Sequence, residues 1–420
     1  MSFLGRQIVN TALTAIAARP VRTQRAGVVS FATGWLVSEL APQMIALTAA
    51  DTAAHLIHPG KGKRRSKVGV ALALTNTAVH LRRLQASTQV TAVLDKALDD
   101  TLNDDHSAAM SGLEPRDHTW PTREMFHPFK FPKDEVHIDR DIAYSDAGGR
   151  GTLDIYRPAD HRFLQGAPVL LQVHGGAWIL GAKDQQGLPL MHEMAARGWV
   201  CVAINYRLAP RDKFPAQVVD VKRAIAWIKE HIAEYGGDPD YVAITGGSAG
   251  GHLAALAALT PDDVTLQPGF EEADTSVQLA VPHYGVYDMA GSTGLATAVD
   301  MRDKFLARKV FGTTWAKDPE AFEAASPILR ATDKAPDFFV LHGDADSLVD
   351  VNQARLFVDR LREVSRHSVS YAEFPGAQHA YEIFNSVRSA HVTRAVSRYL
   401  RGHHAAWASG RSVPEVTATV

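Results

Sequence analysis

The chain is poor in cysteine and lacks the short motifs that hold metal ions. Cys201 is the only cysteine among 420 residues, so no intrachain disulfide can form, which fits a reducing, cytoplasmic setting. Neither a CxxC pair nor an HExxH motif occurs, so we expect no metal site. Because Cys201 lies inside the apolar run 199–204, it is expected to be a small buried hydrophobe.

A surplus of positive charge is also missing. The formal net charge is −2, and a protein that neutralises phosphates needs many more basic than acidic side chains, so nucleic acid is not an expected partner. The charge is unevenly placed, because residues 1–67 carry nine basic and two acidic side chains, a surplus of +7. We therefore expect the N-terminal part to meet different surroundings from the rest of the chain.

Long apolar runs are scarce. A spanning helix needs about 20 mostly apolar residues, and residues 27–50 reach that length only by including Glu39 and Pro42. The apolar stretch 68–81 is too short to span alone. Residues 1–18 make a poor secretory signal, because asparagine and threonine interrupt their apolar region.

Three interpretations of the alanine-rich, helical segment 1–111 stay open. It forms a helical cap over a catalytic domain, an interfacial membrane hairpin whose basic loop 61–67 contacts anionic head groups, or a transmembrane anchor. Polar residues within the apolar stretches weaken the third interpretation. In the second interpretation, residues 1–81 would make the peripheral membrane contact. The basic loop taken alone is typical of a solvated connection between two helices.

The rest of the chain predicts an α/β domain. Residues 112–134 are rich in proline, aromatic and charged residues without periodicity, which is typical of a linker. Beyond them, short apolar runs alternate with stretches long enough for helices, which indicates a mostly parallel sheet flanked by helices. The runs are 136–138, 152–156, 168–173, 199–204, 241–244, 279–281, 338–341 and 369–374, the first two forming a hairpin. The domain is expected over 135–401, with a fraying tail at 402–420 and no internal repeat.

One predicted strand-to-helix junction carries a serine between glycines. The sequence GGSAG at 246–250 stands between the apolar run 241–244 and the helix-forming residues 252–259. A very sharp turn leaves no room for side chains beside its apex, and it lifts the serine hydroxyl above the positive end of the following helix. Ser248 is therefore the candidate nucleophile.

A serine hydroxyl needs a base, and the base needs a carboxylate that orients it. In the α/β-hydrolase arrangement the acid and then the histidine follow the serine, each after a late strand. Asp344, Asp346 and Asp350 follow the run ending at Leu341, and His379 follows the last predicted strand. We predict His379 as the base and Asp346 as the acid, because the acid must reach the base from a loop beyond its strand. Asp344, nearer the strand end, and Asp350, which could cap the next helix, stay open.

A pair of glycines follows another predicted strand, in the motif HGGAW at 174–178. Acyl transfer builds negative charge on the carbonyl oxygen, and preorganised N–H groups must meet that charge. Paired glycines let the backbone approach closely. We expect the amides of Gly175, Gly176 and Ala249 to supply three donors, with His174 supporting the loop.

Together these motifs resemble the hormone-sensitive-lipase-like family of α/β-hydrolase esterases, and most of all the actinobacterial Lip-type carboxylesterases with an extra N-terminal helical segment. The resemblance covers roughly residues 135–400 and rests on HGGA at 174–177, NYRLAP at 205–210 with FPA at 214–216, the segment 235–252, and the loops of Asp346 and His379. Two positions depart from the family pattern. Ala177 stands where a third glycine is usual, although alanine still offers an N–H, and Gly247 stands where an acidic residue is usual.

The resemblance further implies a cap over the active site. N-terminal residues would build one part of it, and an insertion at 289–326, after the run 279–281, would build the other. Apolar residues of the insertion could line the site or only pack the cap onto the core; they are Met301, Phe305, Leu306, Val310, Phe311 and Trp315.

The expected function is hydrolysis of carboxylic esters, with short to medium acyl chains, through an acyl-enzyme on Ser248. This chemistry needs no metal or organic cofactor, the partner is a small-molecule ester, and homo-oligomerisation stays open. The pattern HGGxW is also similar to the arylformamidase signature, so hydrolysis of a formyl amide stays open as the alternative. A prolyl-type peptidase would carry a propeller repeat, which is not visible. A non-catalytic membrane-bound interaction protein would not need the set of nucleophile, base and acid.

Overall fold

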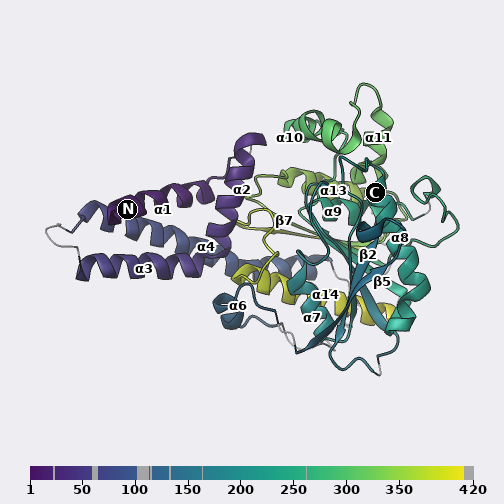
Figure 1. Cartoon of the computed structure of the whole chain (residues 1–420), viewed down its shortest axis with the longest axis horizontal. Helices are drawn as coiled ribbons and strands as arrows, with labels where there is room; N and C mark the ends of the chain where they lie inside the picture. The colour runs from purple at the N-terminus through teal and green to yellow at the C-terminus, as the bar shows by residue number, and fades with distance from the viewer. Residues whose placement is uncertain are drawn as a thin grey trace.

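The computed structural model is organised around one eight-stranded sheet with helices on both faces (Figure 1). It describes residues 1–21, 24–58, 65–101, 113, 116–131, 134–162, 164–261 and 263–410. The strand order is β1-β2-β4-β3-β5-β6-β7-β8. This arrangement confirms the predicted α/β-hydrolase fold.

Only the first strands of the sheet run antiparallel. β1 pairs with β2 in the predicted hairpin, β2 pairs antiparallel with β4, and all pairs from β4 to β8 are parallel. Every predicted run forms a strand: β1 (Val136–Ala143), β2 (Thr152–Pro158), β3 (Ala167–Val173), β4 (Val200–Ile204), β5 (Gly237–Gly247), β6 (Leu279–His283), β7 (Asp337–Gly343) and β8 (Val369–Phe374). The carboxyl ends of the parallel strands therefore share one edge of the sheet.

The central strands are apolar on both faces because helices cover both. In β3, Val169, Leu171 and Val173 pack with α8 (Ala216–His231), α9 (Ala249–Leu259) and α13 (Val351–Val364). Leu170 packs on the opposite face, with α4 (Lys67–Thr101), α7 (Leu188–Ala196) and α14 (Val387–Ala408). This two-sided burial is the physical reason for the continuous apolar runs in the sequence.

The N-terminal helices α1 (Phe3–Ala18) and α3 (Ala41–Ile57) and the first half of α4 extend away from the sheet, as Figure 1 shows. Helix α2 (Gln24–Glu39) lies between this extension and the sheet. The second half of α4 buries Val90, Leu94 and Leu98 in the core beside α14. The predicted segment 1–111 is thus helical where it is described, but α4 also belongs to the helical layer of the main domain.

Residues 61–64 of the predicted basic loop lie outside the described residues, as do residues 102–111 of the predicted N-terminal segment and residues 112, 114–115 and 132–133 of the predicted linker. In the residues of the linker that the structure describes there is one short helix, α6 (Thr122–Phe126). Among the described helices, none combines the length and the apolarity that crossing a bilayer requires.

The prediction of a fraying tail from residue 402 is wrong, because the last helix continues beyond that residue. Helix α14 continues to Ala408, and His403 within it is buried between two polar partners. Its ring Nδ1 lies 2.7 Å from the Tyr241 hydroxyl, and its Nε2 lies 3.0 Å from the Asp337 carboxylate. These partners, distant in the sequence, make burial of a polar helix end favourable. Residues 411–420 lie outside the described part.

The predicted insertion at 289–326 forms a separate layer above the sheet edge. It contains α10 (Ala296–Met301), a π-helical segment (Arg302–Phe311) and α11 (Pro319–Ala324), and α12 (Pro327–Arg330) leads back to β7. Figure 1 places α10 and α11 at the same end of the molecule.

Candidate active site

Ser248 stands at the apex of the turn between β5 and α9. Its φ of 59° and ψ of −120° are costly for a residue with a side chain, and such strain is typical of functional sites. The turn is forced by close packing, because a Cβ on Gly246 would lie 2.5 Å from the Val173 carbonyl oxygen. A Cβ on Gly250 would overlap the same oxygen. The flanking glycines therefore have the steric role predicted for them.

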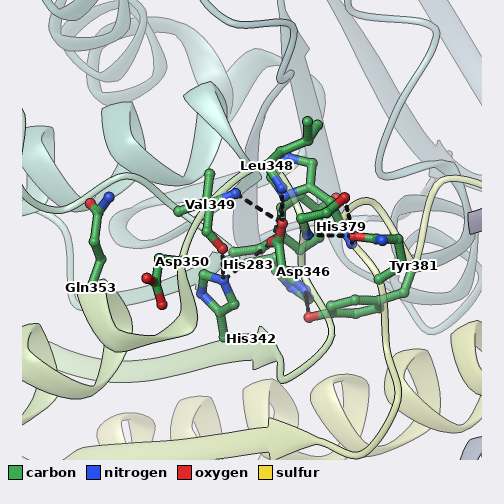
Figure 2. A network of polar contacts seen from close by, with 12 residues as sticks. His283, His342, Asp346, Leu348, Val349, Asp350, Gln353, His379 and Tyr381 are labelled. Carbon is green, nitrogen blue, oxygen red and sulfur yellow. Dashed lines mark hydrogen bonds and ion pairs between the residues drawn. The ribbon is translucent and has the colours of Figure 1, made fainter. Parts of the chain in front are cut away.

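His379 and Asp346 meet at the ends of β8 and β7. The ring Nδ1 of His379 lies 2.6 Å from Oδ2 of Asp346 (Figure 2). The other carboxylate oxygen, Oδ1, accepts from the amides of Leu348 at 2.8 Å and Val349 at 2.9 Å. Both side chains are buried. The backbone thus fixes the carboxylate, and the carboxylate fixes the imidazole.

A second histidine approaches the same carboxylate. Figure 2 shows His342 directed toward Asp346, with Nε2 3.2 Å from Oδ2. Burial acts to raise the pKa of Asp346, but attraction to His379 and hydrogen bonds with His342 and His379 outweigh burial and hold this pKa well below its usual range. The carboxylate is therefore ionised. The sequence signal for His342 was its place four residues before Asp346 at a strand end, which no motif singles out.

The two alternative acids have other partners. Asp344 accepts from the amide of Gly376 at 2.7 Å. Asp350 caps α13 by accepting from the amide of Asn352 at 3.0 Å. Of the three aspartates, Asp346 is the one that the structure brings to His379.

Ser248 opens onto a cavity of about 320 Å³ between the sheet edge, α2 and the segment 289–326. Its walls include Asp346 and Ala177 from the sheet-edge loops, Met301 and Phe305 from the insertion, and Gly27 and Val28 from α2. The other apolar residues proposed for the insertion pack differently: Leu306, Val310 and Phe311 are buried in the core, and Trp315 lies under the Arg302 guanidinium. The insertion therefore both lines the cavity and packs onto the domain.

Helices α2 and α4 contact the loops that carry the acid and the base. The hydroxyl of Ser347 donates to the Gly27 carbonyl at 3.2 Å, and a Cβ on Gly27 would lie 2.8 Å from the Ser347 carbonyl oxygen. The Phe31 ring meets the edge of the His379 ring, with centroids 5.8 Å apart. Arg83 of α4 donates to the Gly376 carbonyl at 3.1 Å. The N-terminal helices thus form part of the wall of the site.

One predicted oxyanion donor needs correction. The Gly175 amide donates to Oε1 of Gln186 at 2.6 Å, so this N–H is already used. Gly175 itself lies against the serine turn, where a Cβ would come within 2.6 Å of the Gly247 carbonyl oxygen. Among the described residues, the amides of Gly176 and Ala177 have no acceptor, and Ala177 borders the cavity.

The HGGAW loop is held by aromatic packing. His174 stacks on Tyr206, with centroids 4.2 Å apart, and its Nδ1 lies 2.7 Å from the Gly175 carbonyl oxygen. Burial lowers the pKa of His174 to about 4, so the ring is neutral. At the other end of the loop, Trp178 donates to His252 at 3.1 Å. These contacts give His174 the supporting position expected of it.

Position 247 needs a glycine because the ring of Tyr284 lies directly against it. A Cβ there would lie 2.8 Å from Cζ of Tyr284, whose hydroxyl donates to the buried carboxyl of Glu382. The Tyr284 ring also packs on His379, with centroids 4.5 Å apart. Burial raises the pKa of Glu382 to about 7. The departure from the family pattern therefore accompanies a buried Tyr–Glu pair that no sequence motif indicated.

Two further observations concern possible metal ligands and the cysteine. Within it, no group of three or more His, Cys, Asp or Glu side chains could hold a metal ion. Cys201 is buried in β4, and burial raises the pKa of its thiol. The thiol is thus neutral, as expected of a small buried hydrophobe.

Solved structures and a domain family agree with this architecture. The domain family described as BD-FAE matches residues 153–361. The propionate-bound esterase Est2 of the planctomycete Thermogutta terrifontis is 26% identical and has a TM-score of 0.52, over 68% of this chain and 98% of that chain. The fold and the site together place the chain in the class of α/β-hydrolase esterases.

Proteins of similar sequence identify the family within this class of esterases. The chain is 49% identical over 320 residues to the probable carboxylic ester hydrolase LipM of Mycobacterium tuberculosis, covering 75% of this chain and 73% of LipM. It is 50% identical over 260 residues to the esterase LipQ of the same organism, covering 62% of this chain and 61% of LipQ. The chain belongs to the family of Lip-type esterases, as the sequence motifs predicted.

Proposed function

We propose that the protein hydrolyses carboxylic esters, with Ser248 as nucleophile, His379 as general base and Asp346 as the acid that orients the base. The observation that carries this proposal is the pairing of two buried groups at the cavity of Ser248: His379 Nδ1 lies 2.6 Å from Asp346. Because Asp346 takes Nδ1, the free ring nitrogen for the serine proton is Nε2.

In the proposed reaction the Ser248 oxygen attacks the acyl carbonyl while His379 takes the hydroxyl proton. His379 then gives this proton to the leaving alcohol, and an acyl-enzyme remains on Ser248. Water attacks the acyl-enzyme with the same base, which releases the carboxylic acid and restores the serine. Asp346 stays ionised throughout and stabilises the imidazolium that forms.

For the oxyanion we propose the amides of Gly176, Ala177 and Ala249. Ala249 begins α9, so its N–H is among those that lack an acceptor within the helix and face the positive helix end. The amides of Gly176 and Ala177 are free of acceptors among the described residues, whereas Gly175 serves Gln186. Ala177 thus takes the role first expected of Gly175, and it fills the place of the usual third glycine.

The proposed substrates are esters of short to medium acyl chains. The cavity of about 320 Å³ lies at the lower end of the range of roughly 300–1,000 Å³ found for small-molecule sites. Met301, Phe305 and Val28 give it apolar walls. A series of aryl esters of increasing acyl length tests this proposal, with the highest kcat/KM expected before the long-chain members.

Replacing Ser248 with alanine tests the chemistry. Ser248→Ala is expected to lower kcat for a short aryl ester at least about a thousandfold, because the nucleophile is lost. Ser347→Ala is the matched control, since Ser347 lines the same cavity and its hydroxyl only donates to the Gly27 carbonyl or Gln378. Hydrolysis by Ser248→Ala at the wild-type rate would refute the proposal. A wild-type enzyme that prefers an N-formyl aromatic amide to the matching ester would favour the arylformamidase alternative.

A second part of the proposal concerns contact between the protein and a membrane. We propose peripheral membrane contact through residues 1–81, supported by the apolar side chains that α1, α3 and α4 expose. This contact is independent of the chemistry at Ser248, and hydrolysis of a dissolved ester does not require it.

A further inference from the structure

The extension built from α1, α3 and the first half of α4 buries several polar side chains beside the apolar Phe3, Ala17, Ala41 and Ala73. Its buried side chains include Gln7, Thr14, Thr48, Asn76 and His80. Hydrogen bonds cross between the helices: Gln7 donates to Asp51 at 2.9 Å, and Asn10 donates to Thr48 at 3.1 Å. Thr14 bonds within α1, and in the described part of the chain neither ring nitrogen of His80 has a partner. Water-soluble helical bundles bury apolar stripes instead. Hydrogen-bonded polar side chains between helices are typical of bundles in an apolar medium.

The outer surface of the same extension is apolar. On α3 the exposed large side chains are Leu47, Leu56 and Ile57, and on α4 they are Val68, Leu74 and Leu81. Leu47 and Leu74 are each 66% exposed, and α3 packs directly on α4. Figure 1 shows α3 and the first half of α4 reaching away from the sheet, and the exposure of these side chains shows that the main domain does not cover them. A group of exposed large apolar side chains on two helices that pack together indicates a docking surface.

The charges around these faces suit an anionic partner. Within residues 41–57 and 68–81 the one Asp, Glu, Lys or Arg is Asp51, and Arg6 neutralises it at 2.6 Å. Exposed cations stand at both ends of the apolar stretch of α4, Lys67 before it and Arg82 after it. Basic side chains that flank an apolar helix face are typical of helices that lie in a membrane interface.

The same cations determine how the extension would lie. Helix α3 has 17 residues, which corresponds to about 25 Å. End-on insertion would carry Lys67 into the acyl chains, which is costly for a charged group. If the helices lie along the surface instead, Lys67 and Arg82 stay at the level of the head groups while the leucines enter the acyl layer.

We propose that the outer faces of α3 and of the first half of α4 form a docking surface for an anionic lipid bilayer, with the helices lying along the membrane. This inference rests on the membrane contact proposed above and names its surface, its lipid chemistry and its orientation. Helix α2 connects this surface to Gly27 and Val28 at the cavity wall, so docking holds the active site near the bilayer.

Flotation of the full-length protein with lipid vesicles tests the surface. The wild type is expected to float with vesicles of phosphatidylcholine and phosphatidylglycerol in equal parts, and less with phosphatidylcholine alone. The double variant Leu47→Glu/Leu74→Glu is expected to lower the partition coefficient at least about tenfold, because the two side chains that would enter the acyl layer become charged. Lys67→Glu/Arg82→Glu is expected to abolish the preference for the anionic vesicles.

A matched control carries the same changes elsewhere. Val264 and Leu329 are exposed on the main domain, and Val264→Glu/Leu329→Glu is expected to float like the wild type. Hydrolysis of a dissolved aryl ester at the wild-type rate shows that each variant is folded, and it reports on Ser248 separately from membrane contact. A wild type that stays at the bottom with anionic vesicles overturns the inference. So does a Leu47→Glu/Leu74→Glu variant that floats unchanged but loses an oligomeric state in light scattering, since a second copy of the chain would then cover the surface.

Discussion

A buried ion pair ties α2 to the loop that carries His379, and its removal gives a quantitative prediction. Glu39, at the end of α2, accepts from Nε of Arg388 at 3.0 Å and from the Ser386 hydroxyl at 2.7 Å. The Arg388 side chain is 0% exposed, and its Nη1 donates to the Pro375 carbonyl at 3.0 Å. Glu39→Ala would leave a guanidinium buried without its counter-charge.

The expected cost of Glu39→Ala is about 3–5 kcal/mol of unfolding free energy, the range found when one partner of a buried pair is removed. The matched control is Glu363→Ala, because Glu363 pairs with Arg360 on the surface, and such pairs contribute below about 1 kcal/mol. Removing both charges, in Glu39→Ala/Arg388→Met, should recover much of the loss, since no uncompensated charge remains.

Urea unfolding at neutral pH, followed by circular dichroism, measures these differences. Ester hydrolysis well below the unfolding transition should also fall in Glu39→Ala, because Arg388 supports the start of the loop that carries His379. The reasoning is refuted if Glu39→Ala unfolds at the same urea concentration as Glu363→Ala. It is equally refuted if the double variant is less stable than Glu39→Ala.

Three further predictions concern the site itself. Asp346→Asn should lower kcat for an aryl ester about a thousandfold or more at unchanged fold, because His379 loses its orienting charge; kinetics showing a loss of only a few-fold would contradict this role. Burial raises the pKa of Glu382 from 4.5 to about 7, so the folded protein keeps a proton that the unfolded chain has lost. Stability should therefore fall by about 3 kcal/mol as the pH rises through this window, at 1.36 kcal/mol per unit. Glu382→Gln should flatten that slope in urea unfolding, and an unchanged slope would show that another group titrates. Gly247→Ala should cost about 1–3 kcal/mol in the same assay, because its Cβ would press on the Tyr284 ring; wild-type stability would mean that the ring moves freely.

The strands and the serine turn could be predicted because their signals are local. Each central strand is buried on both faces, so burial appears directly as a continuous apolar run. Glycine is needed around Ser248 because a side chain there would clash with β3. The positions of Asp346 and His379 follow from the order of the strands. At these positions a stretch of only a few residues is enough to predict the local structure.

Long-range side-chain pairing could not be predicted. The Gly175 amide is occupied by Gln186, whose place in the next loop has no sequence signal. The end of α14 was expected to fray, yet His403 finds buried partners in β5 and β7. The pairing of Glu39 with Arg388 joins positions 349 apart. Such contacts depend on the completed packing and not on composition or period.

Covalent labelling of Ser248 tests the central claim most directly. Incubation with an activated organophosphonate, which reacts with serine nucleophiles, is expected to add one adduct per chain and abolish ester hydrolysis in parallel. Peptide mass spectrometry should place the adduct on Ser248, and Ser248→Ala should remain unlabelled. An adduct on another residue, or full loss of activity while Ser248 stays unmodified, would contradict the proposed mechanism.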